Sequence, residues 1–470
     1  MVSWAILGSM TVMARDRWRW SYSGSTLFPI VGSFVVTPVL TRMLSPHEYG
    51  SVAVAALTVQ VAGLVLALGL SSRIILTVVR QGPAQARGLT LAAVIVGVAL
   101  GVSAAVLLWP VRAGESWLTA CLIALYGAGI SAGISNLLSL LRSLRIPKPY
   151  VLVSALTSVG APVIGLASVY FSHGSWWNYL AGLYLGTTLA LLVGWRSCRG
   201  PVEFHWRNIQ NSVLVGLPLL PHQVAIASLP LLIVALASAK ESPATAGSLQ
   251  LGLYLASTVS LAVGALNATW SPAVLGANAS DRPNLARSWF RRVSWLVSGL
   301  YVLLAWFAPT ATRVLASGAY DRDLISRTAI LAGMSGVATV FLTGESHFLL
   351  ARDRTKSLAF VAPLIVLAAF SGMRSWWETS EYLPGCAMTV SFLMISMWIR
   401  FANVLNHDSH IPGTEYIGPL VLMLSVGCTC FLANSWIARA SVQVASGAVL
   451  VALGLMAISQ RRRIGGFFNV

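Results

Sequence analysis

The chain has 470 residues, of which 56% are hydrophobic and only 10% are charged, and its formal net charge is +17 at pH 7. Charged residues make up roughly a quarter of an ordinary soluble protein, so this composition excludes one. Apolar runs of the roughly 20 residues that a helical span requires recur along the sequence. We therefore predict an all-α polytopic membrane protein.

About fourteen apolar runs are long enough to cross a bilayer as helices. In chain order they cover residues 25–41, 50–70, 89–109, 117–141, 150–171, 176–195, 212–238, 246–270, 293–311, 328–350, 357–373, 383–401, 416–433 and 439–459. Most of the 31 Lys and Arg residues fall in alternate loops of this arrangement. Because basic loops stay on the cytoplasmic side, we predict that both termini are cytoplasmic.

The basic net charge does not require a nucleic-acid partner. The excess of Lys and Arg lies in the predicted inside loops, where anionic lipid headgroups and the topology rule account for it. The five cysteines have no spacing typical of a metal site or a disulfide framework. We therefore expect no nucleic acid, no metal and no cofactor.

An internal repeat relates the first and seventh spans. Each contains two prolines nine residues apart, namely Pro29 with Pro38 and Pro221 with Pro230. After an insertion in the following turn, Gly50 aligns with Gly247. Duplicated helical units are common in transporters, and we predict four segments: a lead-in at 1–24, an N-lobe of six helices at 25–210, a C-lobe of six helices at 211–401, and two further helices with a basic tail at 402–470.

Two hairpins resemble a known family. The segments concerned are Pro38–Gly50 (PVLTRMLSPHEYG), Leu68–Ser72 (LGLSS), Leu217–His222 (LPLLPH), Gly252–Tyr254 (GLY) and Leu266–Pro272 (LNATWSP). They are similar to the first, second, seventh and eighth spans of the oligosaccharide flippases that serve O-antigen, capsule and exopolysaccharide assembly. Many relatives carry an Asp-Arg pair in the seventh span where this chain has Ser-Leu-Pro-Leu at 228–231, so a coupling role of such a pair does not transfer.

The resemblance implies a fold and a function. The fold is that of the superfamily that includes multidrug exporters, with two six-helix lobes around a central cavity and transport by alternating access. The implied function is flipping of polyprenyl-pyrophosphate-linked oligosaccharides from the cytoplasmic to the outer leaflet of a bacterial cytoplasmic membrane. The implied partners are this substrate, membrane lipids, and a polymerase or glycosyltransferases of the same pathway.

Two other functions compete with flipping. A drug or metabolite exporter of the same superfamily has the same architecture, although a cation exporter needs acidic residues in its cavity. A membrane polysaccharide polymerase or ligase is less favoured, because the sequence has no long outer loop and no acidic catalytic cluster. We expect a transporter and not an enzyme.

A polar stripe on the fourth predicted span is the first candidate substrate site. Ser131, Ser135, Ser139 and Arg142 share one face of an otherwise apolar helix, and a guanidinium suits a pyrophosphate. The alternative is that Arg142 anchors the helix at the interface and that the serines are packing contacts.

Two further arginines flank the first hairpin. Arg42 at its outer end and Arg73 at its inner end are candidates for phosphate contact as the cavity alternates. Each has an alternative role as an interface anchor, and for Arg42 pairing with nearby Glu48 is a structural explanation.

Glu345 and His347 are the candidates for energy coupling. Glu345 lies roughly 10 Å inside the predicted cytoplasmic end of its span, by helical rise. A carboxylate in a low dielectric changes its protonation readily, so it can couple flipping to proton entry. The alternative is a hydrated carboxylate, or one paired with a basic neighbour.

The seventh and eighth spans supply the remaining candidates. His222 lies between prolines, where the seventh span is expected to bend and to expose backbone carbonyls. Gln250 and Tyr254 share a face of the eighth span and suit hydrogen bonds to sugars. Helix packing explains this face equally well.

Overall fold

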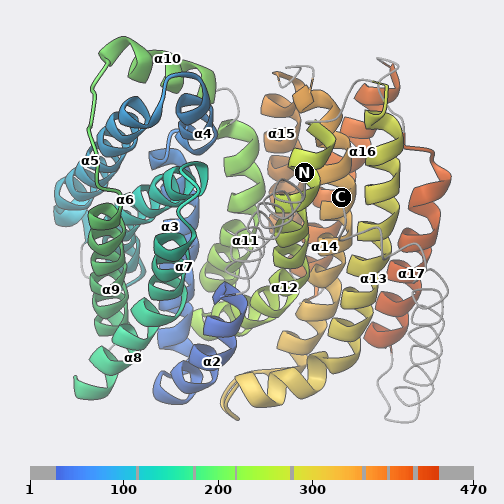
Figure 1. Ribbon diagram of the computed structural model, residues 1–470. Coiled ribbons are helices and arrows are strands. Elements are labelled where there is room, and N and C mark those ends of the chain that lie inside the picture. Colours follow the sequence, from blue (N-terminus) through green and yellow to red (C-terminus); the bar gives the residue numbers. More distant parts are fainter. Residues whose placement is uncertain are drawn as a thin grey trace, which may run out of the picture. The chain divides into compact units, whose positions relative to one another are not determined.

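The computed structural model describes residues 28–112, 116–172, 176–217, 220–275, 280–351, 356–377, 382–405 and 411–432. Every regular element in these ranges is a helix (Figure 1). The predicted lead-in at 1–24, the fourteenth span at 439–459 and the basic tail lie outside them.

Helix packing divides the chain into two compact units, which we describe one at a time. Unit 1 comprises Met1–Gln250, Arg313–Asp321 and Arg352–Trp376. Unit 2 comprises Leu251–Thr312, Arg322–Ala351 and Trp377–Val470. The division into lobes at 25–210 and 211–401 stays a prediction.

The helices of unit 1 follow one another with short connections. They are α2 (Phe28–Met43), α3 (Pro46–Leu66), α4 (Leu70–Arg80), α5 (Pro83–Leu108), the short η1 (Trp109–Arg112), α6 (Ser116–Ser143), α7 (Pro147–Ala155), a π-helical turn η2 (Leu156–Gly160), α8 (Ala161–Phe171), α9 (Trp176–Ser197), α10 (Trp206–Gly216), α11 (Leu220–Lys240) and α15 (Lys356–Trp376). Helix α12 (Pro243–Leu275) begins in unit 1 and continues in unit 2.

Unit 2 contains most of α12 and four further described helices. These are α13 (Arg282–Leu315), α14 (Arg322–Ala351), α16 (Leu383–Leu405) and α17 (Thr414–Leu432). Helix α14 packs extensively against α16 and also contacts α17, and most of its apolar length is buried. It is therefore the central helix of unit 2.

The helices confirm a multi-pass membrane protein. Within the described ranges, 10 helices are long and apolar enough to span a bilayer. They are Pro46–Leu66, Pro83–Leu108, Leu122–Ser143, Pro147–Phe171, Leu220–Lys240, Pro243–Asn267, Arg282–Leu315, Arg322–Leu349, Ala359–Trp376 and Leu383–Leu405. The predicted spans 25–41, 176–195 and 416–433 coincide with α2, α9 and α17, which are helical but fall outside this set.

The second predicted span differs from the observed helices at its end. Helix α3 begins with a capping box, in which the side chains of Ser45 and Glu48 each accept from the other's backbone N–H. It ends at Leu66, where Leu68 and Gly69 take positive φ angles of 53° and 63°. A left-handed pair of this kind stops a helix, so the sequence that follows forms a separate helix, α4, which the span count did not predict.

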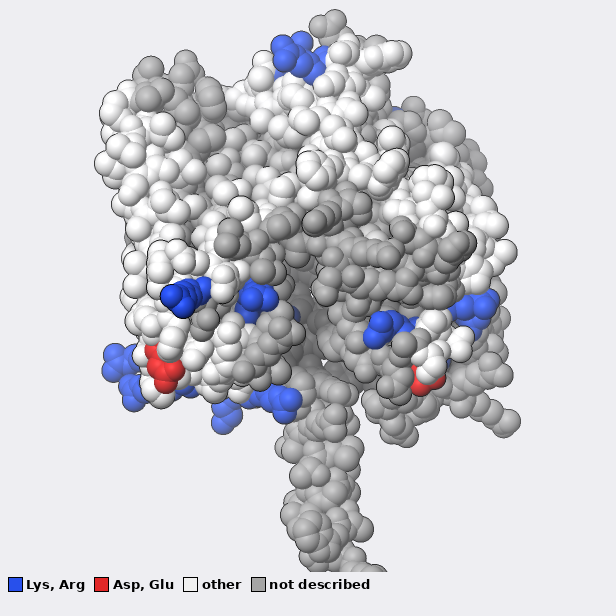
Figure 2. Space-filling view, turned by 90° about the horizontal axis from the view of Figure 1, so that it is seen from above, with Lys and Arg blue, Asp and Glu red and all other residues white. Residues whose placement is uncertain are grey.

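The seventh predicted span also begins later than expected. Residues 212–216 belong to α10, which contacts α4, and the span itself is α11. Ile209 and Val213 on α10 pack against the core of unit 1, whereas Trp206 and Arg207 are exposed. Figure 2 looks onto the end of the molecule where α4 and α10 lie, and shows Lys and Arg in separate groups with fewer acidic side chains.

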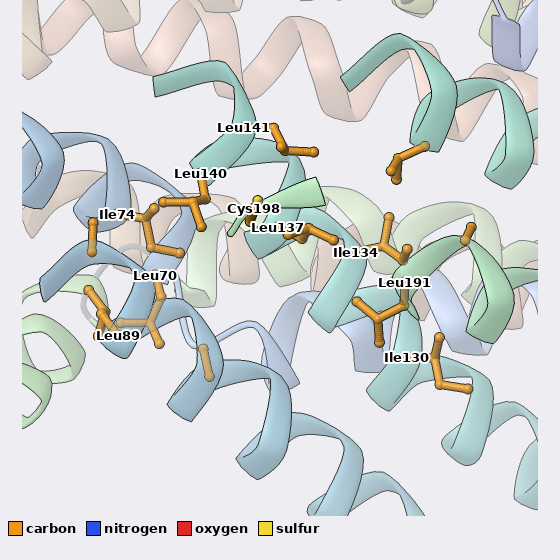
Figure 3. Packing of buried hydrophobic residues seen from close by; sticks show 14 residues of the cluster. Leu70, Ile74, Leu89, Ile130, Ile134, Leu137, Leu140, Leu141, Leu191 and Cys198 are labelled. Carbon is orange, nitrogen blue, oxygen red and sulfur yellow. The ribbon is translucent and has the colours of Figure 1, made fainter. Parts of the chain in front are cut away.

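A cluster of buried apolar residues holds α4 against α6. Leu70 and Ile74, one turn apart on α4, pack with Leu137, Leu140 and Leu141 of α6 (Figure 3). All five are at most 2% exposed. Since the apolar residues of α4 lie on one side, this packing fixes the helix rotation and turns Ser71 toward α6.

Candidate functional site

Ser71, Ser135, Asn136 and Ser139 form a polar cluster on α4 and α6, which we call the α4–α6 cluster, and Arg73 lies two residues after Ser71 on α4. The Ser71 hydroxyl donates to Asn136 Oδ1 over 3.1 Å, and its oxygen lies 3.3 Å from Ser135 Oγ. Ser139 donates to the backbone carbonyl of Ser135 over 3.0 Å. The predicted candidates Arg73, Ser135 and Ser139 therefore lie on two adjacent helices, together with an asparagine that the sequence did not single out.

Asn136 of the α4–α6 cluster and Arg73 on α4 each have a buried donor without a partner among the described residues. Asn136 is fully buried, yet its Nδ2 makes no hydrogen bond, and the buried Nε of half-buried Arg73 makes none either. Buried donors in native proteins are nearly always paired with protein, water or ligand. Unpaired amide and guanidinium N–H groups suit an acceptor such as a phosphate or a sugar hydroxyl.

Arg142 lies in the last turn of α6, one turn beyond Ser139, and is exposed. The predicted stripe of three serines and Arg142 therefore lies on one helix, as expected. Ser135 and Ser139 of this stripe also belong to the α4–α6 cluster. An exposed arginine at a helix end fits either of the two roles that the sequence left open.

Arg42 is held by backbone carbonyls at the other end of unit 1. Its guanidinium donates to the carbonyl of Pro38 on the same helix and, over 3.2 Å, to that of Val314. The neighbouring Thr41 hydroxyl donates to the carbonyl of Leu315 over 2.6 Å. The Glu48 side chain caps α3 at Ser45, whereas the contacts of Thr41 and Arg42 link α2 to the last residues of α13.

The aligned glycines Gly50 and Gly247 make reciprocal contacts, which we call the glycine contact. A Cβ atom on Gly50 would lie 1.9 Å from the carbonyl oxygen of Pro243, and one on Gly247 would lie 2.7 Å from that of Pro46. Each proline lies four residues before its own glycine, at the first position of α3 or α12. The two turns thus contact each other in the same way, which supports the internal repeat.

The remaining candidates of the seventh and eighth spans lie on α11 and α12. His222 is half-buried in the first turn of α11. Gln250 and Tyr254 lie one turn apart on α12, both half-buried, and neither Gln250 Oε1 nor Tyr254 Oη has a described hydrogen-bond partner. Their role as hydrogen-bonding partners of a sugar stays a prediction.

Unit 2 contains a second polar cluster around Glu345, which we call the Glu345 cluster. The Glu345 side chain is 0% exposed. One carboxylate oxygen accepts from Arg400 Nη1 over 3.0 Å and from the Tyr416 hydroxyl, and the other accepts from Asn403 Nδ2 over 2.6 Å. Of the alternatives for Glu345, the geometry fits the carboxylate that is paired with a basic residue.

His347 lies on the same helix but belongs to a separate contact. Its Nε2 lies 3.0 Å from Asn267 Oδ1 on α12, and its ring packs edge-on against Trp270 with ring centroids 4.8 Å apart. His347 is 2% exposed and Trp270 is 0% exposed. The two predicted coupling residues therefore face different neighbours.

Sequence reasoning missed four residues that complete these clusters, namely Asn136, Arg400, Asn403 and Tyr416. Arg400 was assigned only to an inside loop, and the other three are neutral polar residues in or beside apolar runs. Arg400 and Asn403, three residues apart, share one face of α16, and this spacing is the signal that was available. The acceptor, Glu345, is 55 residues away in sequence, and no local pattern reveals such a pairing.

The fold and the two buried polar clusters define a polytopic helical membrane protein with charged groups inside its bundles. No protein-family model matches this chain. No curated protein matches it by sequence.

Solved structures of MATE family transporters are similar in fold. The inward-facing conformation of a multidrug resistance MATE family transporter of the MOP superfamily matches with a TM-score of 0.62 and 15% identity, covering 82% of this chain and 99% of that chain. An outward-facing conformation matches with a TM-score of 0.58 and 13% identity, covering 88% and 96%. A crystal structure of MATE in complex with MaL6 matches with a TM-score of 0.61 and 13% identity, covering 83% of this chain and 96% of that chain. The chain therefore has a MATE-like fold.

Proposed function

We propose that this chain is a membrane transporter that works by alternating access. The MATE-like fold over more than four-fifths of the chain supports this proposal, because solved structures of that fold include both inward-facing and outward-facing conformations. The α4–α6 cluster supports it further, because a buried Asn136 with an unpaired donor is costly unless a ligand or water satisfies it.

The comparisons favour an exporter of drugs or metabolites, since the inward-facing and outward-facing neighbours are both described as a multidrug resistance MATE family transporter. The chemistry of the described residues favours an anionic substrate. Among them, Glu345 is the only acidic residue in a helix interior, and its carboxylate is already bonded to Arg400. A cationic drug would lack a free carboxylate there, whereas the unpaired donors of Arg73 and Asn136 suit an anionic group.

We therefore propose that the substrate is an amphiphile with an anionic head. A polyprenyl-pyrophosphate-linked oligosaccharide is the specific candidate, because the hairpin sequences resemble those of oligosaccharide flippases. Its pyrophosphate suits Arg73, Arg142 and Asn136, and its sugars suit Gln250 and Tyr254. The polymerase and glycosyltransferases of the same pathway are its proposed partners, in a bacterial cytoplasmic membrane with both termini of the chain inside.

Two assays, one in the native host and one in an ethidium-sensitive strain, test the proposal. In the native host, deletion of the gene should trap lipid-linked repeat units on the cytoplasmic side. In a strain sensitive to ethidium, expression of the chain should not lower ethidium accumulation. Lowered ethidium without any effect on the lipid-linked units would instead support drug export, and no effect in either assay would refute transport of both substrates.

Arg73→Gln and Arg142→Ala should impair export of the lipid-linked units at least about tenfold, since each removes a charged donor worth more than a neutral one. Amounts of inserted protein should stay normal. Lys148→Gln is the matched control, because Lys148 is an exposed cation beyond the end of α6. Unchanged export in the Arg73 variant would remove Arg73 from the substrate site.

The glycine contact tests the structural basis of the mechanism. Gly50→Ala should impair transport or stability most and Gly247→Ala less, in the order of their approach to the opposite backbone. Gly264→Ala is the control, because a Cβ atom there meets nothing within 4 Å. The expected destabilisation for Gly50→Ala is about 1–3 kcal/mol, measured by thermal unfolding of the purified protein, and equal effects of all three variants would contradict the contact.

A further inference from the structure

The Glu345 carboxylate receives its donors from two neighbouring helices. Arg400 and Asn403 come from α16, and Tyr416 comes from α17. Asn403 Nδ2 also donates to the backbone carbonyl of Glu345 over 3.0 Å. Both carboxylate oxygens are thus bonded, and the one formal charge among these donors is the guanidinium of Arg400.

The Arg400 guanidinium is held in place on several sides. Its Nη1 donates to the carbonyl of Ile411 over 3.1 Å in addition to Glu345. Its Cζ lies 4.4 Å from the centre of the Tyr416 ring, a distance typical of a cation–π contact. Tyr416 itself packs against Phe290 and Phe341, with ring centroids 4.7 and 5.0 Å away. The cation is therefore fixed by packing as well as by charge.

Two other sets of titratable groups near this cluster have partners of their own. Arg287 on α13 pairs with Glu415 on α17 over 3.0 Å. His347 on α14 bonds to Asn267 on α12. Among the described helices that pack here, the negative charge of Glu345 is thus balanced by Arg400.

We propose that Arg400 is a tethered counter-cation for Glu345, which takes the place that a free Na⁺ or H⁺ would otherwise occupy at this buried carboxylate. This inference rests on the proposed transport function for its meaning: unit 2 goes through the cycle without binding a coupling ion at Glu345. It decides between the two alternatives for that residue in favour of the ion pair.

The proposal has a physical consequence that can be measured. A buried carboxylate without a partner is strongly unfavourable, so removal of Arg400 must create a site that gains from a small cation or a proton. Ligands that bind the folded state raise its melting temperature, and the stabilisation grows with the logarithm of their concentration above the dissociation constant. The parent protein should show no such response.

The experiment measures thermal unfolding of the purified full chain in detergent. The salt is NaCl or N-methylglucamine chloride at about 150 mM, close to physiological ionic strength, and the pH is varied from about 5.5 to 8.5. The parent Tm should be the same in both salts. Arg400→Met should lower the Tm by at least about 5 °C, and Na⁺ or low pH should restore a measurable part of that loss. In Glu345→Gln/Arg400→Met, this response should disappear.

Two controls keep the test decisive. Arg287→Met breaks an ion pair in which the arginine side chain is 49% exposed, so it should give no dependence on Na⁺. Arg400→Lys keeps a tethered cation and should stay insensitive to Na⁺ if Arg400→Met fails to fold.

Two results would overturn the proposal. In the first, the parent Tm rises with Na⁺ and Glu345→Gln abolishes the rise, which makes Glu345 a site for a free cation. In the second, Arg400→Met is as insensitive to Na⁺ and pH as the parent. Neither result depends on transport, so failure of this proposal is distinguishable from failure of the proposed function.

Discussion

The two polar regions of this chain differ in which atoms are left unpaired: an acceptor, Asn403 Oδ1, in the Glu345 cluster, and donors beside α4 and α6. In the Glu345 cluster of unit 2, both carboxylate oxygens are bonded and Arg400 supplies the opposite charge. In unit 1, Asn136 Nδ2 of the α4–α6 cluster and Nε of Arg73 on α4 have no partner among the described residues. Both clusters are built from polar side chains inside apolar helical bundles.

This difference separates a structural site from a binding site. A buried carboxylate whose two oxygens are both bonded rigidifies the helices that carry it, and breaking its ion pair leaves an unpaired buried charge. A cluster with spare donors is itself costly and becomes favourable only when a ligand or water completes it. A charged residue in a membrane span is therefore a poor guide to substrate binding until its partners are known.

The largest expected effect is on stability in unit 2. Glu345→Leu should lower the free energy of unfolding by about 3–5 kcal/mol, because it leaves the Arg400 cation without its acceptor. Thermal or denaturant unfolding of the purified protein measures this. The matched control is Glu415→Gln, whose partner Arg287 is half exposed, and which should cost at most about 1 kcal/mol. Equal losses of unfolding free energy in the two variants would show that the buried ion pair contributes no more to stability than the exposed one.

A smaller effect is expected at Tyr416. Tyr416→Phe keeps the ring packing and the contact with Arg400 but removes the hydroxyl that donates to Glu345, at a cost of about 1–3 kcal/mol. Tyr254→Phe provides the comparison, because the Tyr254 hydroxyl is buried without a described partner. That variant should be neutral or slightly more stable, and a reversed order of the two Tm values would contradict the geometry.

The smallest effect on stability, with the largest effect on function, is expected at Asn136. Asn136→Leu loses the bond from Ser71 but also removes an unpaired buried donor, so the free energy of unfolding should change by about 1 kcal/mol or less. Export should fall at least about tenfold if the cluster binds substrate. In unit 2, Asn403→Leu should instead destabilise the protein by about 2 kcal/mol or more, because two bonds to Glu345 are lost. The same substitution thus separates the two clusters.

Most of the helices could be predicted from hydrophobic runs, because a bilayer requires long apolar helices wherever the chain crosses it. The separate helices α4 and α10 could not. Helix α4 begins where Leu68 and Gly69 take left-handed backbone angles, and only Gly69 signals this in the sequence. Helix α10 is short and depends on Ile209 and Val213 packing against the core of unit 1.

The candidate site was predictable in part. Ser135, Ser139 and Arg73 were found because polar residues on an apolar helix stand out from their neighbours. Asn136 was missed, since it lies off the face that the serines share and its importance depends on Ser71 from another helix. Arg42 was found as a charged residue, yet its contacts with distant backbone carbonyls give it a structural role.

The sequence by itself determined that this chain is a helical membrane protein, because composition and apolar run length are local properties, and its recurring prolines predict an internal repeat. Only the tertiary structure decided which polar groups are paired and which remain free. The partners of Glu345 lie 55, 58 and 71 residues away along the chain, and their meeting depends on how α14, α16 and α17 are rotated and packed. Helix rotation is set by the contacts of whole helix faces, which no single stretch of sequence contains.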